Sequence, residues 1–217
     1  MTRRMLAKLE AIQNKLRSQI SLVDNFDYPP KVVTGFDLAY KGELGIAAAV
    51  SLDYESFSVL ETKVLISQVK FPYIPTYLAF REAPLIIQIL KKLKIKPDVI
   101  MVDGHGIAHP RKLGSATYIG IITKKPSIGV AKRNLCGTYL PPTNIYDSKP
   151  VIFNDEIVGY AIKTKPNTSP IFISPGTNIS VETTKRIVLH LIKNHKLPEP
   201  LFLADKLSKE SKKKLLT

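Results

Sequence analysis

A chain of 217 residues with 44% apolar side chains is long enough to bury one large core, or at most two small ones. Its well-mixed charges and near-neutral mean hydropathy exclude a globally disordered chain, and no stretch approaches the roughly 18 apolar residues of a transmembrane helix. The single Cys136 excludes an intrachain disulfide framework and a cysteine-rich zinc site.

The excess of basic side chains is the first indication of function. The chain has 32 Lys and Arg against 18 Asp and Glu, which gives a net charge of +14. Such an excess favours polyanions, chiefly nucleic acid, because binding releases the counterions that surround phosphates. A lysine-rich solubilising surface, as on a heat-adapted protein, is the alternative. The segment KLSKESKKKLLT at the C-terminus carries part of this charge and is expected to be a solvated basic tail.

The first twenty residues predict an amphipathic helix. They are charged throughout and lack the apolar core and cleavage site of a secretory signal, so we expect a cytoplasmic protein. Apolar side chains recur at helical spacing, namely Met5, Leu9, Ile12 and Leu16.

A meander of strands and then alternating helices and strands are expected next. Three β-rich runs at 31–40, 44–54 and 57–67 are separated by short polar turns, which is typical of antiparallel strands. Residues 80–94 predict a helix, which tolerates Pro84 only because this residue falls near the first turn. The remaining elements expected are a strand at 98–103, a helix at 112–123, a strand at 126–132, a hairpin at 149–164 with its turn near NDE, a strand at 170–174, a helix from Ser180 to about Asn194, and a last helix after LPEP.

This order of elements is that of ribonuclease H-like folds. There is no internal repeat and no long linker, so we expect one α/β domain over residues 1–217, with an N-terminal helix and the basic tail. Its central mixed sheet would have three antiparallel strands followed by parallel strands, with helices on both faces. An analogy of fold does not by itself decide function.

Three acidic residues stand where apolar residues would be expected. Asp37 lies within the first strand, Glu82 lies on the apolar stripe of the helix at 80–94, and Asp103 ends the strand at 98–103. A buried carboxylate needs a cation nearby, because burying its charge alone costs several kcal/mol. A separate ion pair with a Lys or Arg would explain the burial of any one of these acids, but a shared metal ion explains the burial of all three better.

Oxygen ligands without thiolates predict Mg²⁺, with Mn²⁺ as a substitute, rather than zinc. A basic protein with such an ion suggests hydrolysis of phosphodiester bonds. Lys132 follows a strand at the same sheet edge and is a candidate for holding a phosphate oxygen. His109, in the glycine-rich segment after Asp103, is a candidate for orienting a phosphate or moving a proton. His105, His190 and His195 are expected to be structural.

The stretches GFDLAY, FPYIPTYLAFREAP, DGHGIAHPRKLGSA, PSIGVAKRNLCGTY, PIFISPG, LPEP and LADKLSK, in this order, resemble the endonuclease V family. The resemblance implies a ribonuclease H-like DNA repair nuclease that recognises deaminated bases, chiefly inosine. It implies Mg²⁺-dependent hydrolysis of the second phosphodiester bond 3′ to the lesion.

The resemblance also assigns residues to roles. It implies that Asp37 and Asp103 are the principal metal ligands with Glu82 as their companion, that Lys132 contacts the phosphate, and that Asp205 is a further acid of the site. His109 would lie beside the lesion. Contacts with the substrate are expected from a stiff wedge, Pro72, Tyr73, Ile74 and Pro75, and from Gly114 and Ser115.

Three positions depart from the family pattern. Thr177 stands where many relatives have histidine, Tyr118 where histidine is common, and Thr76 where glycine is common beside the base pocket. These departures bear on lesion preference and strand contacts rather than on cleavage.

Two alternatives follow from the residues. One is a structure-selective nuclease of the same fold or an enzyme that cleaves inosine-containing RNA, and the other is a non-catalytic nucleic-acid-binding module. The wedge argues against the structure-selective nuclease and the three acids argue against the binding module. We expect a monomer whose partner is nucleic acid rather than a membrane.

Overall fold

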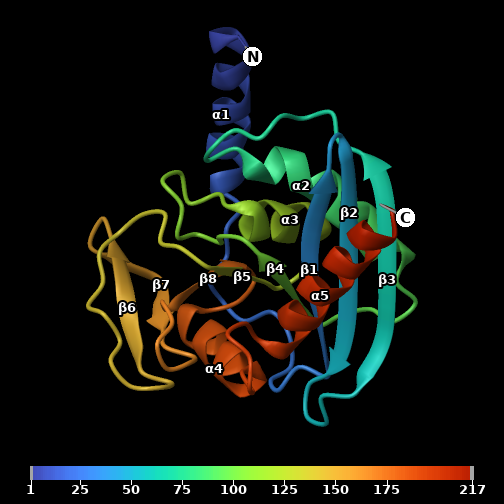
Figure 1. Ribbon diagram of the computed structural model, residues 1–217. Coiled ribbons are helices and arrows are strands. Elements are labelled where there is room, and N and C mark those ends of the chain that lie inside the picture. The colour runs from blue at the N-terminus through green and yellow to red at the C-terminus, as the bar shows by residue number, and fades with distance from the viewer. Residues whose placement is uncertain (1, 216–217) are drawn as a thin grey trace.

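The computed structural model describes residues 2–215, and its centre is an eight-stranded sheet in the order β3-β2-β1-β4-β5-β8-β7-β6 (Figure 1). The strands are β1 (Val32–Lys41), β2 (Leu44–Asp53), β3 (Val59–Gln68), β4 (Val99–Asp103), β5 (Ser127–Ala131), β6 (Ser148–Phe153), β7 (Glu156–Ile162) and β8 (Ile171–Thr177). The helices are α1 (Arg3–Arg17), α2 (Leu78–Lys92), α3 (Ser115–Thr123), α4 (Val181–Leu191) and α5 (Glu199–Lys214).

The strand directions agree with the ribonuclease H-like fold. Strands β1, β2 and β3 form the predicted antiparallel meander, and β4 and β5 run parallel to β1. Strands β8, β7 and β6 then extend the sheet in antiparallel pairs, so its parallel part is limited to β1, β4 and β5. The predicted β6–β7 hairpin turns at Asn154 and Asp155, which both have positive φ, as a two-residue turn of type I′ requires.

Helices cover both faces of the sheet because the buried strands carry apolar side chains on both sides. Val99 and Met101 of β4 pack in the core cluster that includes α4 and the start of α5. Ile100 and Val102, which alternate with them, pack in the cluster formed with α2 and α3. Among residues 2–215, no helix combines the length and the apolar composition that crossing a membrane requires.

Helix α2 differs from the prediction at its start. It begins at Leu78 rather than Phe80, so Pro84 lies in the second turn and not near the first. Proline has no amide hydrogen, so the Phe80 carbonyl has no helical partner there. Helix α3 likewise begins at Ser115 rather than Lys112, because Lys112 has a φ of +54°.

Both ends of the chain also differ from expectation. Helix α1 forms as predicted but stands away from the body of the protein (Figure 1), and Met5 and Ile12 on its apolar stripe are exposed. The basic segment expected to be a solvated tail is the second half of α5 up to Lys214. It is helical because one side of it is buried, with Ser208 inaccessible and Leu207 packed against β2.

The close approach of α5 to β1 depends on Gly35. A Cβ atom at this position would lie 2.4 Å from the carbonyl carbon and oxygen of Pro200, which are backbone atoms and cannot rotate away. The absence of a side chain on Gly35 therefore sets how closely the last helix lies on the first strand.

We predict that Gly35→Ala destabilises the protein by roughly 1–3 kcal/mol, because the added methyl group forces α5 away from β1. Chemical denaturation measures this change in the free energy of unfolding. Gly42→Asn is the control: Gly42 has a φ of +56° and open space around it, and Asn tolerates this conformation. Equal stability of Gly35→Ala and the wild type would contradict the prediction.

Candidate metal centre and adjoining pocket

Strand register brings the first two acids together. Phe36 of β1 pairs with Val102 of the parallel strand β4, so the next residues, Asp37 in the middle of β1 and Asp103 at the carboxyl end of β4, lie side by side. This edge of a parallel sheet is where α/β proteins commonly place their sites. Asp37 is only 6% exposed and Asp103 is half-buried.

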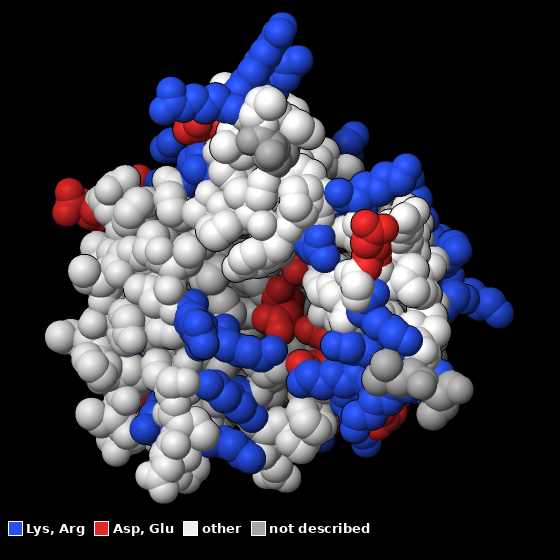
Figure 2. All heavy atoms as spheres, turned by 45° about the horizontal axis from the view of Figure 1, so that its top comes forward, with Lys and Arg blue, Asp and Glu red and all other residues white. Residues whose placement is uncertain are grey.

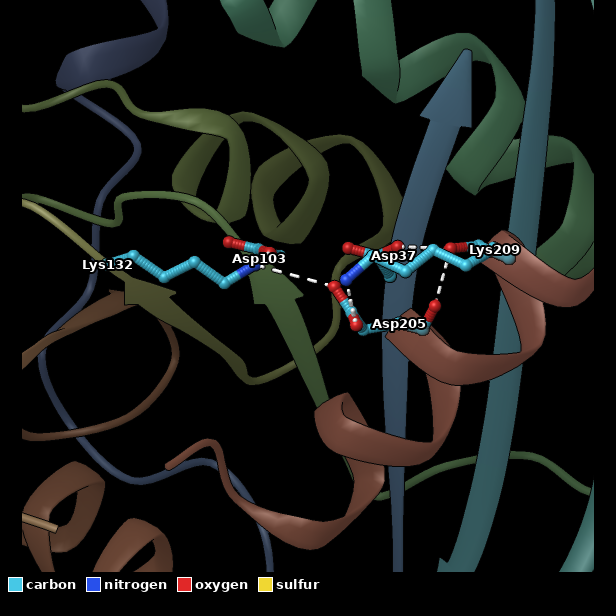
Figure 3. Close-up of polar contacts among 6 residues, drawn as sticks. Asp37, Asp103, Lys132, Asp205 and Lys209 are labelled. Atoms are coloured by element: carbon cyan, nitrogen blue, oxygen red, sulfur yellow. Dashed lines mark hydrogen bonds and ion pairs between the residues drawn. The ribbon is translucent and has the colours of Figure 1, made fainter. Parts of the chain in front are cut away.

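Asp205 of α5 completes a group of three carboxylates (Figure 3). One carboxylate oxygen from each of Asp37, Asp103 and Asp205 lies within 4.8 Å of the others. A donor set made only of carboxylate oxygens suits a hard divalent cation such as Mg²⁺ or Mn²⁺. The arrangement therefore fits the predicted metal, with Asp205 in the position of a third ligand.

Two lysines and one serine contact this cluster. The Lys132 ammonium lies 2.6 Å from Asp103 Oδ2 and 3.5 Å from Asp205 Oδ1, and Lys209 lies 2.5 Å from Asp205 Oδ2. Burial opposes the charge of Lys132, yet the nearby carboxylates raise its pKa. The Ser208 hydroxyl donates to Asp37 Oδ2 at 2.5 Å.

Glu82 lies apart from the three aspartates. It is 8% exposed on α2, and the Ser115 hydroxyl donates to its Oε2 at 3.3 Å. Burial, followed by the charge of Asp103, raises its pKa to about 8. Burial also raises the pKa of Asp37 to about 6, with further contributions from Asp103 and Asp205. Both pKa values are raised chiefly because burial disfavours the charged carboxylate, and the neighbouring carboxylates add to this effect.

The metal ligands predicted from the sequence were Asp37, Asp103 and Glu82, whereas the structure groups Asp205 with the two aspartates instead. Glu82 nevertheless lines the same cavity of about 330 Å³ as Asp37, Asp103 and Lys132. It therefore faces the cluster from the side of α2 and lies outside the set of three.

A second cavity of about 170 Å³ adjoins the acids. The two cavities share Leu78 and His105 as lining residues. Five residues predicted to contact substrate line it, namely Tyr73, Pro75, His109, Gly114 and Ser115. Pro72 and Ile74 do not. The other lining residues are Thr76, Leu78, Ala79, His105, Leu113 and Leu135, so most of the wall is apolar.

The ring of His109 has no free nitrogen. Its Nε2 donates to the Thr76 carbonyl at 3.1 Å, and its Nδ1 accepts from the Arg111 amide at 3.2 Å. Burial and the charge of Arg111 lower its pKa to about 4, so the ring is neutral at physiological pH. His109 is therefore part of the pocket wall, with both of its ring nitrogens engaged.

The segment predicted to be a wedge is exposed only in part. Tyr73 is 68% exposed, whereas Ile74 is half-buried. Of the positions that depart from the family pattern, Tyr118 packs edge-on against Phe80, and the Thr177 hydroxyl accepts from the Ser21 amide at 3.1 Å.

The surface around the acids is basic. Figure 2 shows acidic side chains at the bottom of a hollow, with Lys and Arg side chains around its rim. A rim of this kind attracts a phosphate backbone toward the carboxylates, which would repel it in the absence of a metal.

Sequence reasoning missed several residues of the site. Ser208 lies three residues after Asp205, a spacing that places both on one face of a helix, but a serine in a lysine-rich segment carries no signal of its own. Leu135 and Leu78 are ordinary apolar residues whose place in the pocket depends on how the loops fold back.

Comparison with known proteins agrees with the family resemblance of the sequence motifs. The model of the endonuclease V family matches residues 14–206. The endonuclease V of Roseiflexus castenholzii is 39% identical over 208 residues, which cover 95% of this chain and 93% of that protein. The endonuclease V of Dictyoglomus turgidum is 41% identical over 199 residues, with coverage of 91% and 87%.

Solved structures show the same similarity. Endonuclease V from Streptomyces avermitilis superposes with a TM-score of 0.89 at 33% identity, and covers 97% of this chain and 94% of its own. Endonuclease V from Ciona intestinalis, in complex with a 24mer DNA that contains an inosine followed by a ribo-adenosine, superposes with a TM-score of 0.86 at 28% identity, with coverage of 98% and 99%.

We predict that the stability of the metal-free protein falls as the pH rises from about 5 to about 9. The unfolded Glu82 carboxyl ionises near its ordinary pKa of 4.5, whereas the folded one keeps its proton to about pH 8, so the folded state loses free energy relative to the unfolded state across this interval. Glu82→Gln stays neutral and should reduce the fall by on the order of 2 kcal/mol.

Denaturation in EDTA at several pH values measures this effect, with the exposed Glu10→Gln as control. Added Mg²⁺ should stabilise the wild type most at high pH, where the carboxylates are ionised. An unchanged pH dependence in Glu82→Gln would contradict the assignment.

Proposed function

The chain belongs to the endonuclease V family, and on this premise we propose that it is a Mg²⁺-dependent nuclease that recognises inosine and other deaminated bases in DNA. We propose further that it hydrolyses the second phosphodiester bond 3′ to the lesion. Family membership makes it a hydrolase that cleaves DNA. The single observation that best supports the finer proposal is the group of three carboxylates next to a separate, mostly apolar pocket.

Asp37, Asp103 and Asp205 would hold the metal ion. Mg²⁺ bound there would neutralise charge on the scissile phosphate and acidify the attacking water. The carboxylates would then exchange their present partners, Lys132 and Lys209, for the ion, which frees both ammonium groups to face the phosphate. Lys132 is the better placed of the two, because it also lines the cavity that contains Asp37 and Asp103.

The adjoining pocket would receive the base. Its walls offer apolar surface from Leu113 and Ala79 and polar edges from Ser115 and the backbone near Gly114. A base inside it lies out of the stack, and a deaminated base leaves the stack more easily because it pairs weakly. The exposed Tyr73 would fill the gap that the base leaves behind.

The endonuclease V of Ciona intestinalis, whose structure contains inosine DNA, supports the proposal that inosine-containing DNA is a substrate. The ribo-adenosine that follows the inosine in that DNA makes inosine-containing RNA the alternative substrate to test. We also propose that the protein is cytoplasmic and monomeric.

We predict that the protein cleaves an oligonucleotide with one inosine in Mg²⁺, and that EDTA abolishes cleavage. Asp103→Asn should reduce the single-turnover rate by at least about a hundredfold, because it removes one anionic ligand. Binding in EDTA should persist. Asp155→Asn, in the exposed β6–β7 turn, is the matched control.

The matched substrates are the same sequence with adenine, and the RNA counterpart with inosine. Product length on a sequencing gel locates the cut. Equal cleavage with and without inosine would favour a structure-selective nuclease. Wild-type cleavage by Asp103→Asn would remove this residue from the centre. Faster cleavage of the RNA would make RNA the substrate.

We predict that Tyr73→Ala weakens binding of inosine in duplex DNA by about tenfold, and in single-stranded DNA by much less. Stacking on an aromatic ring contributes roughly 1–3 kcal/mol per base, and only a duplex has a partner base that must be displaced. Fluorescence anisotropy in EDTA measures both affinities. Tyr146→Ala, another exposed tyrosine, is the control. Equal losses on both substrates would make Tyr73 a simple stacking contact.

A further inference from the structure

Helix α1 contacts the rest of the protein through a buried amide. Although α1 stands away from the body (Figure 1), Gln13 is its one fully buried residue, with 0% of its surface exposed. Its Oε1 accepts from Arg111 Nε at 2.5 Å, and its Nε2 donates to the Thr76 carbonyl at 3.1 Å. Both ends of a buried amide are thereby satisfied, as burial requires.

Arg111, the other partner of Gln13, also contacts Thr76. The Thr76 carbonyl accepts from three donors, which are Gln13 Nε2, His109 Nε2 at 3.1 Å and Arg111 Nη2 at 2.8 Å. The Thr76 hydroxyl also accepts from Arg111 Nη2, at 2.7 Å. The Arg111 guanidinium lies over the ring of the next residue, Tyr77, 4.5 Å from its centroid.

Thr76 needs this support because its backbone is strained. It has a φ of +67°, and a β-branched residue rarely adopts the left-handed region. Such a conformation persists only where the surroundings impose it. Three donors on one carbonyl and a fourth contact on the hydroxyl provide that constraint.

The strained turn forms one wall of the pocket. Tyr73, Pro75 and Thr76 line the cavity from this side, and Leu78 and Ala79 follow directly at the start of α2. Gln13 and Arg111 do not line the cavity themselves. Any change in the turn therefore moves the wall and the projecting Tyr73 together.

We propose that Gln13 and Arg111 are positioning residues that hold the left-handed turn at Thr76, and that they thereby set the affinity of the pocket for an extruded base. The proposal rests on the function proposed above, in that a base occupies this pocket. Neither residue touches the carboxylate cluster. Their loss should change binding and KM and leave the rate at saturating substrate unchanged.

Gln13→Met tests the proposal, because methionine has a similar length but makes neither hydrogen bond. We expect about tenfold weaker binding of a single-stranded inosine oligonucleotide in EDTA, a KM raised by a similar factor, and an unchanged kcat. Asn14→Met places the same side chain at the exposed neighbouring position and should behave as the wild type. Wild-type KM in Gln13→Met, or a loss confined to kcat, would overturn the proposal.

A rescue experiment separates positioning from general stability. Glycine adopts a positive φ without strain, so the turn in Thr76→Gly no longer needs to be held. We expect Gln13→Met combined with Thr76→Gly to recover most of the lost affinity. A double variant that binds as weakly as Gln13→Met alone would show that the amide serves another purpose, and would overturn the proposal.

Two further measurements keep the proposal testable if Gln13→Met folds poorly or if inosine is not the substrate. Arg111→Lys keeps the charge but loses the planar group that contacts Gln13 and Thr76 together, and should raise KM in the same way. The Tyr77 amide donates to the Ile74 carbonyl at 3.0 Å and reports on the turn.

Hydrogen exchange at the Tyr77 amide should accelerate in Gln13→Met and Arg111→Lys but not in Asn14→Met, whatever the substrate. Equal binding of inosine and adenine oligonucleotides by the wild type would count against the proposed function alone. Unchanged exchange in both variants would overturn the role of Gln13 and Arg111.

Discussion

Mutual repulsion among three carboxylates is the constraint on which this structure depends. Asp37, Asp103 and Asp205 place oxygens within 4.8 Å of one another, a distance at which like charges strongly oppose each other in a partly buried site. The fold imposes this arrangement from three directions, through the register of β1 and β4, the close contact of α5 with β1 at Gly35, and the lysine that follows β5.

Recognition and chemistry use different parts of the fold. The carboxylates belong to two strands and a helix, which fixes them with the precision that a metal ion requires. The pocket is built from loop segments between β3 and α2 and between β4 and α3, and these have been stiffened by Pro75 and by the contacts of Arg111. His105 and Leu78 belong to both cavities, so a bound base and the scissile strand would share a wall.

The sequence identified the parts of the site in which a residue type conflicts with its position. Asp37 and Asp103 stood out because each is an acid in a strand whose other residues are mostly apolar. Glu82 stood out because it lies on the apolar stripe of a helix. Ser208 and Gln13 carried no such conflict, since a polar residue on an exposed-looking helix is ordinary. Their importance comes from contacts across 171 and 63 residues of sequence, which local patterns do not reveal.

The fold was predictable where local sequence patterns determine an element. Alternating apolar residues and short turns indicated the antiparallel strands, and the NDE turn indicated the β6–β7 hairpin. The second half of α5 was mistaken for a tail because its lysines hide a narrow buried side, formed by Ser208 and Leu207. The sequence likewise does not show that Thr76 and Arg111 occupy both ring nitrogens of His109.

The contribution of α5 has a consequence for how the protein is made. Ser208 and Asp37 are 171 residues apart, and α5 supplies both Asp205 and the hydroxyl that holds Asp37. A ribosome adds roughly 5–20 residues per second, so β1 leaves it many seconds before the helix that completes the centre. Throughout that time the nascent chain presents basic surface to nearby nucleic acid while it lacks one of its three acids. Synthesis from the N-terminus thus adds the third carboxylate of the group last.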